Sequence, residues 1–271
     1  MISAVLLLAI GLMDAVLGLA KGRPGARVGA TAVALLVPAA GWLLLGTPPI
    51  WAAIVALWGV WWLRAETGFL RGGGYVAFLT VSILTVPLVA VAAIAEGTTI
   101  DDSPAARAFA RSAGAAELPL SLSLAVAAVA AALILTRSAN VVCRAAFGRT
   151  RSTDAPVAPP PSRRAWRVAV GSRAIGSVVE DVGAPTAAAA PALRGGRVIG
   201  PLERILIVAL ALVGAQAVIV GLLAAKGIVR FPEISADGRS GSKAEEFLIG
   251  SLVSWTIAGL VTAYLVLQRI S

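Results

Sequence analysis

Long apolar stretches alternate with short polar loops along this chain of 271 residues. An α-helix needs about 20 apolar residues to cross the roughly 30 Å hydrocarbon core of a bilayer. Six stretches approach or reach that length: residues 2–20, 28–45, 75–95, 118–136, 201–225 and 247–267. The pattern therefore predicts an all-α fold, a polytopic transmembrane helical bundle.

The number of spans depends on a seventh, shorter stretch, residues 50–63. As a helix its 14 or so residues would extend about 21 Å, which is less than the hydrocarbon thickness. If it crosses, the bundle has about seven spans. If residues 28–63 form a re-entrant hairpin instead, the count falls to five.

The charge of the loops predicts an orientation. Arginine-rich loops follow residues 20, 63 and 136, and such loops stay on the cytoplasmic side. The loop of residues 96–117 carries four acidic residues and two arginines, so we expect it outside. Seven spans then place the N-terminus outside and the C-terminus in the cytoplasm. The excess of arginine over lysine suits a bacterial protein, and we expect the plasma (inner) membrane.

Composition supports a membrane protein and narrows its chemistry. The chain is 58% hydrophobic and 14% charged, against about 25% charged residues in soluble domains. It has no histidine and one cysteine, which removes the commonest general base and thiolate metal clusters. No catalytic constellation stands out, so we expect no enzyme activity, no cofactor and no metal. Attraction to the anionic headgroups of the lipid bilayer, the expected partner, explains the net charge of +9. We expect no nucleic acid as a partner.

Three regions are predicted. Residues 1–137 would form an N-terminal transmembrane bundle, and residues 201–271 a C-terminal transmembrane helix pair. Between them, residues 138–200 form an arginine-, proline- and alanine-rich cytoplasmic loop, expected to be partly disordered. Within it, the pattern of apolar and basic residues over 162–182 predicts either a basic amphipathic helix on the inner leaflet or a short, weakly ordered element. The candidate membrane-surface residues are Arg163, Arg164, Trp166, Arg167 and Arg173.

Two polar residues inside predicted spans are candidate binding residues. Asp14 is an ion or proton site, a carboxylate paired with Arg64 or Lys21, or a residue that lies near the cytoplasmic interface. Gln216 lies near the middle of the 201–225 stretch, where an amide either bonds a neighbouring helix or contacts a substrate.

The last candidates lie in the C-terminal region. Lys226 or Arg230 is expected to meet Glu245 or Glu246 in a salt-bridged cap, with an anion or headgroup site as the alternative. The surrounding motifs are Gly200-Pro201-Leu202-Glu203-Arg204, Ala224-Ala225-Lys226, Arg230-Phe231-Pro232-Glu233 and Lys243-Ala244-Glu245-Glu246-Phe247-Leu248-Ile249-Gly250. With them, residues 194–262 resemble the C-terminal part of uncharacterised bacterial multi-pass membrane proteins, a resemblance that implies no particular activity.

The sequence thus predicts a non-catalytic integral membrane protein that acts as an interaction or structural component. Its partner would be a lipid, another protein or a second copy of the chain. The alternative is a small transporter or channel for an ion or small solute, using Asp14 and Gln216.

Overall fold

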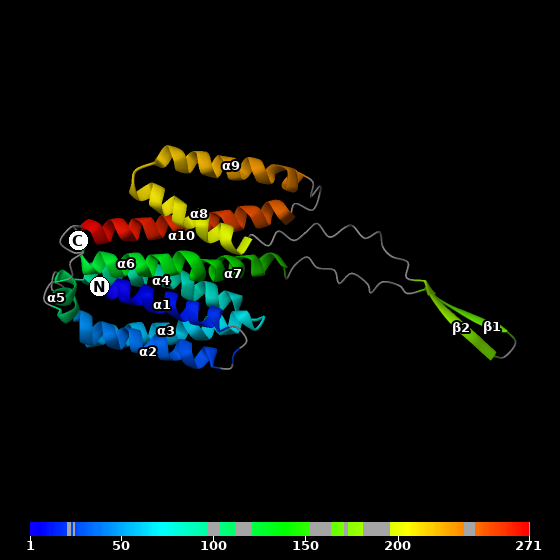
Figure 1. Ribbon diagram of the computed structural model, residues 1–271, viewed down its shortest axis with the longest axis horizontal. Coiled ribbons are helices and arrows are strands. Elements are labelled where there is room, and N and C mark those ends of the chain that lie inside the picture. Colours follow the sequence, from blue (N-terminus) through cyan, green and yellow to red (C-terminus); the bar gives the residue numbers. More distant parts are fainter. Residues whose placement is uncertain are drawn as a thin grey trace.

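The computed structural model describes residues 1–20, 23, 25–96, 103–111, 121–151, 164–170, 173–180, 196–235 and 242–270. Its helices run side by side in a long bundle, and a small β-hairpin lies apart from them (Figure 1). The helices are α1 (Ile2–Leu19), α2 (Ala26–Leu45), α3 (Pro49–Leu70), α4 (Tyr75–Ala95), α5 (Pro104–Ala110), α6 (Leu122–Leu133), α7 (Ala139–Arg151), α8 (Gly196–Leu212), α9 (Gln216–Ser235) and α10 (Ser242–Ile270). The strands are β1 (Arg164–Val170) and β2 (Arg173–Glu180).

The first four helices alternate in direction and are joined by short turns. Gly46 ends α2 with a φ of 67°, and Pro49 begins α3 in the first helical position. Gly74 precedes α4 with a φ of 72°. Glycine adopts positive φ without the steric cost of a Cβ, so these turns are encoded locally. The predicted span 75–95 is confirmed as α4, and predicted spans 2–20 and 28–45 are confirmed within two residues.

The short stretch 50–63 belongs to a much longer helix. α3 has 22 residues, equivalent to about 33 Å, and packs against α1, α2 and α4. Arg64 and Glu66 do not end it, because a charged residue is compatible with a helix and no proline or glycine interrupts the chain there. Helix α3 ends at Leu70, and Gly72 and Gly74 follow with positive φ.

The fifth span continues without a break into the region predicted as a loop. α6 passes through a π-helical turn, Ile134–Ser138, into α7, which ends at Arg151. Residues 138–151 are therefore helical, and the long loop begins later than predicted. Of the described helices, five are long and apolar enough to cross a membrane: α1, α2, α4, the 122–147 segment and residues 244–269 of α10.

The predicted stretch 201–225 is two helices, and the expectation of a single span is wrong. α8 ends at Leu212, Gly214 has a φ of 76°, and α9 begins at Gln216 and turns back. Figure 1 shows α8 and α9 as a hairpin beside α10. The C-terminal region therefore holds three helices rather than a pair.

This break places both chain ends at one end of the bundle (Figure 1). The Gln268 side chain donates to the Ser3 hydroxyl over 3.2 Å, joining the last turn of α10 to the first turn of α1. Opposite sides of a membrane are tens of ångströms apart. The two chain ends therefore lie together, which does not fit the expectation of an outside N-terminus with a cytoplasmic C-terminus.

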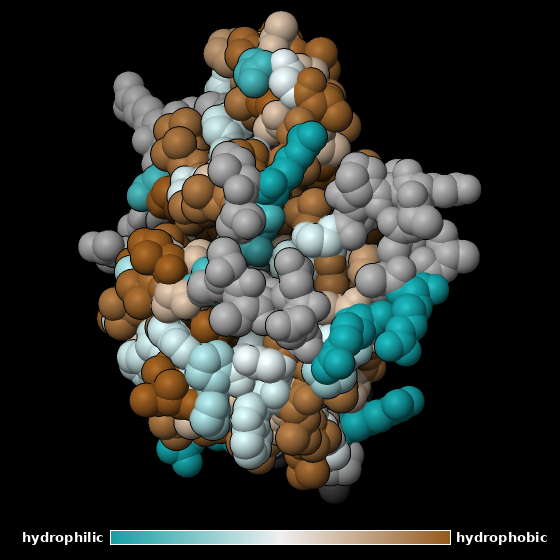
Figure 2. All heavy atoms as spheres, turned by 90° about the vertical axis from the view of Figure 1, so that its left-hand side faces the viewer, coloured by the Kyte–Doolittle hydropathy of each residue, from teal (hydrophilic) through white to brown (hydrophobic). Residues whose placement is uncertain are grey.

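Small residues allow the helices to approach closely. Ala30 and Ala34 of α2, Ala127 and Ala130 of α6 and Ala258 of α10 are fully buried. Such residues are typical of helix contacts in membranes, where packing replaces the hydrophobic effect between helices. Seen from the end where the termini lie, apolar residues occupy much of the outline of the bundle (Figure 2).

Residues 164–170 and 173–180 form antiparallel strands, so the first of the two alternatives for 162–182, a basic amphipathic helix, is wrong. Arg164 pairs with Glu180 and Val170 with Arg173, with a bulge between Val168 and Ala169. The segment is rich in valine and isoleucine, which favour strands, and Gly171-Ser172 separates its two halves in the sequence.

Candidate functional site: a cationic groove between two helix groups

A charged cluster ties α8, α9 and α10 together. Lys226 of α9 binds both carboxylate oxygens of Glu203 on α8 at 2.7 Å. Trp255 of α10 donates its indole N–H to the same carboxylate over 3.1 Å. The Lys226 ammonium also lies 5.5 Å from the Trp255 ring centre and 5.9 Å from that of Phe247, within the range of cation–π attraction.

For Lys226, this arrangement differs from the predicted cap. Lys226 pairs with Glu203, 23 residues earlier, rather than with Glu245 or Glu246. The side chains of Lys226 and Glu203 are 27% and 11% exposed, so the pair is more shielded from water than an ordinary surface pair. Helix α8 turns Glu203 toward α9 and α10 because the hairpin at Gly214 folds α9 back along it.

The next residue, Arg204, joins the C-terminal helices to the rest of the bundle. Arg204 is 2% exposed, and its guanidinium donates to the Leu135 carbonyl at 2.8 Å, to Asn140 Oδ1 at 2.6 Å and to Ser254 Oγ at 3.2 Å. These acceptors come from the π-helical turn, α7 and α10. The planar fork of arginine donors matches three acceptors at once, which a lysine would not.

Between the N-terminal helices and α8–α10 lies a wide groove of about 2130 Å³. Loop charge predicts that the end of the bundle away from the termini is cytoplasmic. The groove lies at this end, where α3 ends and α4 begins (Figure 1). Its apolar walls include Leu19, Leu70, Phe147 and Phe247. Its basic lining residues are Arg23, Arg27, Arg71, Arg137, Arg144, Arg204, Lys226 and Arg230, and its acidic ones are Glu203 and Glu246.

The charges at the mouth of the groove are exposed to solvent. Arg23, Arg27 and Arg71 are exposed, and they come from the turns at the ends of α1, α2 and α3. Within the ranges the structure covers, no carboxylate is paired with these three residues. A groove with apolar walls and a cationic mouth matches the shape and charge of an anionic amphiphile.

Asp14 lies in the core of the N-terminal bundle, where its partners are not the predicted ones. The Trp62 indole donates to Asp14 Oδ1 over 2.9 Å, and the Glu66 carboxyl group lies beside Asp14. Asp14 and Glu66 are both 0% exposed. Arg64 points to solvent and does not pair with Asp14. Lys21 lies outside the described residues.

The other predicted site residues are spread over the molecule. Gln216 is the exposed first residue of α9, so its expected position in the middle of a span is wrong. Arg230 and Glu246 line the groove, and Glu245 is exposed. Among the membrane-surface candidates, Arg164, Trp166 and Arg167 lie in β1, Arg173 begins β2, and Arg163 lies outside the described residues.

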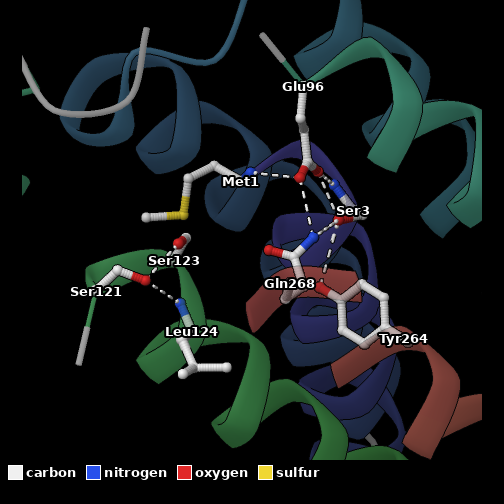
Figure 3. A network of polar contacts seen from close by, with 8 residues as sticks. All are labelled: Met1, Ser3, Glu96, Ser121, Ser123, Leu124, Tyr264 and Gln268. Atoms are coloured by element: carbon white, nitrogen blue, oxygen red, sulfur yellow. Dashed lines mark hydrogen bonds and ion pairs between the residues drawn. The ribbon is translucent and has the colours of Figure 1, made fainter. Parts of the chain in front are cut away.

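A second polar network lies at the opposite end of the bundle (Figure 3). Glu96, which follows α4, accepts from the Ser3 backbone N–H at 2.6 Å, from the Ser3 hydroxyl and from Gln268 at 3.0 Å. Its carboxylate also lies 3.0 Å from the Met1 ammonium group. Tyr264 places its hydroxyl 3.3 Å from that of Ser3.

Burial and hydrogen bonding shift the pKa values of this network in opposite directions. Burial alone would raise the pKa of Glu96, but the hydrogen bonds from Ser3 and Gln268 and the Met1 charge hold that pKa below its usual value. Burial lowers the pKa of the Met1 ammonium group, although Glu96 partly opposes the shift. The network therefore contains an ionised carboxylate in a largely buried position.

Sequence reasoning missed several of the residues that hold these sites, among them Glu66, Glu96, Arg137 and Arg204. The sequence spacing could have identified Glu66, since Trp62 and Glu66 are four residues apart and share one face of a helix. Glu96 and Gln268 are 172 residues apart, and no local pattern predicts that they meet.

No family model matches the chain, and neither a curated protein nor a solved structure matches it. The resemblance of residues 194–262 to uncharacterised membrane proteins therefore stays a prediction. The function of the groove is inferred from its own geometry and charge.

Proposed function

We propose that this protein is a non-catalytic component of the bacterial plasma membrane that binds anionic phospholipid headgroups in its cationic groove. The observation that carries the proposal is the combination of apolar walls with the exposed cations Arg23, Arg27 and Arg71 at the mouth. A phospholipid satisfies both parts, because acyl chains bury apolar area while arginine binds phosphate oxygens with paired hydrogen bonds.

The proposed orientation places the groove at the inner leaflet. Arg23, Arg27, Arg64 and Arg71 all belong to the end of the bundle away from the termini, and positively charged loops remain cytoplasmic. Both termini are then outside. We propose six crossings, by the five apolar helices and α3, with α8 and α9 as a hairpin packed beside α10.

Thermal unfolding in mixed micelles tests the proposal. Added phosphatidylglycerol should raise the unfolding midpoint of the wild-type protein more than added phosphatidylcholine, since a ligand stabilises the state that binds it. The triple variant Arg23→Gln, Arg27→Gln, Arg71→Gln should lose this difference.

A matched control is available at the other end of the bundle. Arg107, Arg111 and Arg269 are also exposed, and their replacement by glutamine removes the same charge. This variant should keep the response to phosphatidylglycerol. Equal loss in both variants would show a general charge effect and would refute a site in the groove. Co-purification of a discrete protein that depends on Arg23, Arg27 and Arg71 would instead favour a protein partner.

A small transporter remains the second candidate. The specific observation in its favour is the pair of buried carboxyl groups, Asp14 and Glu66, inside the membrane bundle. Ionisable residues in such positions often mark ion or proton paths.

A further inference from the structure

Asp14 and Glu66 face each other across the contact between α1 and α3. Both side chains are 0% exposed and belong to the packed interior of the N-terminal bundle. Asp14 is five residues before the end of α1, equivalent to about 7.5 Å along the helix axis. The pair is therefore buried but close to the groove end of the bundle.

Most polar atoms of the pair have no hydrogen-bond partner. Trp62 bonds Asp14 Oδ1, but Asp14 Oδ2 and both Glu66 carboxylate oxygens are inaccessible and unpaired. Ser138 lies against Asp14, is 2% exposed, and its hydroxyl is also unpaired. An unsatisfied buried polar atom costs about 1–3 kcal/mol, and more when charged. Four such atoms in one place need a proton or another donor to satisfy them.

The positive charges around the pair do not balance two ionised carboxylates. Two ionised carboxylates would bring a charge of −2 into a dry interior, where like charges strongly oppose each other. Arg137, from the π-helical turn, supplies one positive charge, and its Nε donates to the backbone carbonyl of Asp14. Arg144 of α7 also acts on Glu66, but it is exposed to solvent, which weakens its effect.

The other helices packed here add no compensating charge. α6 has no ionisable residue, α4 has only Tyr75 and α2 has only Arg27, in its first turn at the groove. One added proton would therefore leave a single negative charge opposite Arg137. It would also turn one carboxyl group into a donor for the other.

We propose that Asp14 and Glu66 form a proton-binding site in which the two carboxyl groups share one proton, exchanged with water through the groove beside Arg137. Binding takes one proton from water, changes the charge of the pair from −2 to −1, and forms an O–H···O bond between the two side chains. This site is separate from the headgroup-binding function and does not depend on it.

A route for exchange is visible beside the pair. Arg137, Thr67 and Gly18 line the groove, and they are neighbours of Ser138, Glu66 and Asp14 in the chain or on the same helix face. The Arg137 guanidinium occupies the space that a Cβ on Gly18 would need. Gly18 thus makes room for the arginine that separates the pair from the groove.

The small number of ligands favours a proton over a metal ion. Across the described parts of the chain, no group of three or more histidine, cysteine, aspartate or glutamate residues is placed to hold a metal. The neighbouring Arg137 also repels cations. A shared proton pairs one oxygen of each carboxyl group without further ligands.

Infrared difference spectroscopy of the full chain in lipid discs tests the proposal. At neutral pH the wild-type protein should show the C=O stretch of a protonated carboxyl group, shifted in D₂O. The band should disappear in Asp14→Asn and also in Glu66→Gln, because each variant removes one of the two groups that share the proton. Glu245→Gln, which changes an exposed carboxylate, is the control and should leave the band intact.

Each other result overturns the proposal. Absence of the band in the wild-type protein would show that both groups are ionised. Loss of the band in only one variant would show a single protonated acid without sharing. A band that responds to sodium at constant pH would show a cation site. If Asp14→Asn does not fold, Asp14→Ser, which also removes the carboxyl group, takes its place in the comparison with Glu66→Gln.

Discussion

Gln268, in the last turn of α10, donates a hydrogen bond to the Ser3 hydroxyl in the first turn of α1, over 3.2 Å. The same amide donates to Glu96, which follows α4, over 3.0 Å. One side chain thus joins three helices whose ends are far apart in the sequence (Figure 3). It also holds both termini at one end of the bundle.

This shared side can be tested by cysteine labelling. In a Cys143→Ala background, Arg107→Cys on α5 and Arg269→Cys on α10 should both react with an impermeant maleimide in intact cells. Arg71→Cys, at the opposite end, should react only after lysis. All three arginines are exposed, so the variants are matched. If Arg107→Cys and Arg269→Cys label from different sides, the arrangement of the termini is refuted.

Loss of the Gln268 amide should destabilise the bundle. Gln268→Ala removes one of the two donors to Glu96 Oε2 and leaves that oxygen to the Met1 ammonium group alone, and the Glu96 side chain is only 7% exposed. We expect a decrease of about 1–3 kcal/mol in the free energy of unfolding, measured by denaturant titration in micelles. Gln216→Ala is the control, since Gln216 is exposed and should change stability little. Equal effects of the two variants would contradict the role given to Gln268.

The Glu96 network predicts a loss of stability in acid. Because the pKa of Glu96 is lowered in the folded protein, its stabilising contribution is present above the ordinary glutamate pKa and is lost as pH falls through the lower, folded value. The wild-type protein should therefore be more stable than Glu96→Gln above pH of about 4.3, and the difference should shrink below it. Unfolding midpoints measured against pH would show this, and a difference that grows in acid would contradict it.

Two glycines of α10 should respond in opposite ways to alanine. A Cβ on Gly250 would overlap the Phe147 ring of α7, so Gly250→Ala should cost about 1–3 kcal/mol through overpacking. A Cβ on Gly259 would meet nothing within 4 Å, and Gly259→Ala should be neutral or gain up to about 1 kcal/mol from helix propensity. Unfolding of both variants under identical conditions measures the contrast. A neutral Gly250→Ala would show that α7 and α10 do not approach so closely.

The helices were predictable where hydropathy and turn residues agree. Residues 75–95 lie between a glycine-rich turn and a polar loop, and α4 has these bounds. The break at Gly214 was not predictable in the same way, because Val213 and Ala215 on either side of it are apolar and give no polar signal. Mean hydropathy along the chain reports burial in lipid or protein. A turn made of apolar residues leaves the mean hydropathy unchanged.

Pairings between helices were harder to predict than the helices themselves. Lys226 has acidic residues at similar distances on both sides in the sequence, and only the fold of the α8–α9 hairpin selects Glu203 over Glu246. Asp14 was correctly singled out as a polar residue inside a span, but Glu66 is 52 residues away and was assigned to a loop. Charge patterns identify which residues need partners, whereas packing decides which partners they meet.

Native mass spectrometry of the protein extracted from its own membrane into lipid discs tests headgroup binding most directly. The wild-type protein should carry anionic phospholipid in a fixed stoichiometry, and the Arg107, Arg111 and Arg269 glutamine variant should carry the same amount. The Arg23, Arg27 and Arg71 glutamine variant should lose it. Wild-type protein without bound anionic lipid, or equal retention in both variants, would contradict a headgroup site in the groove.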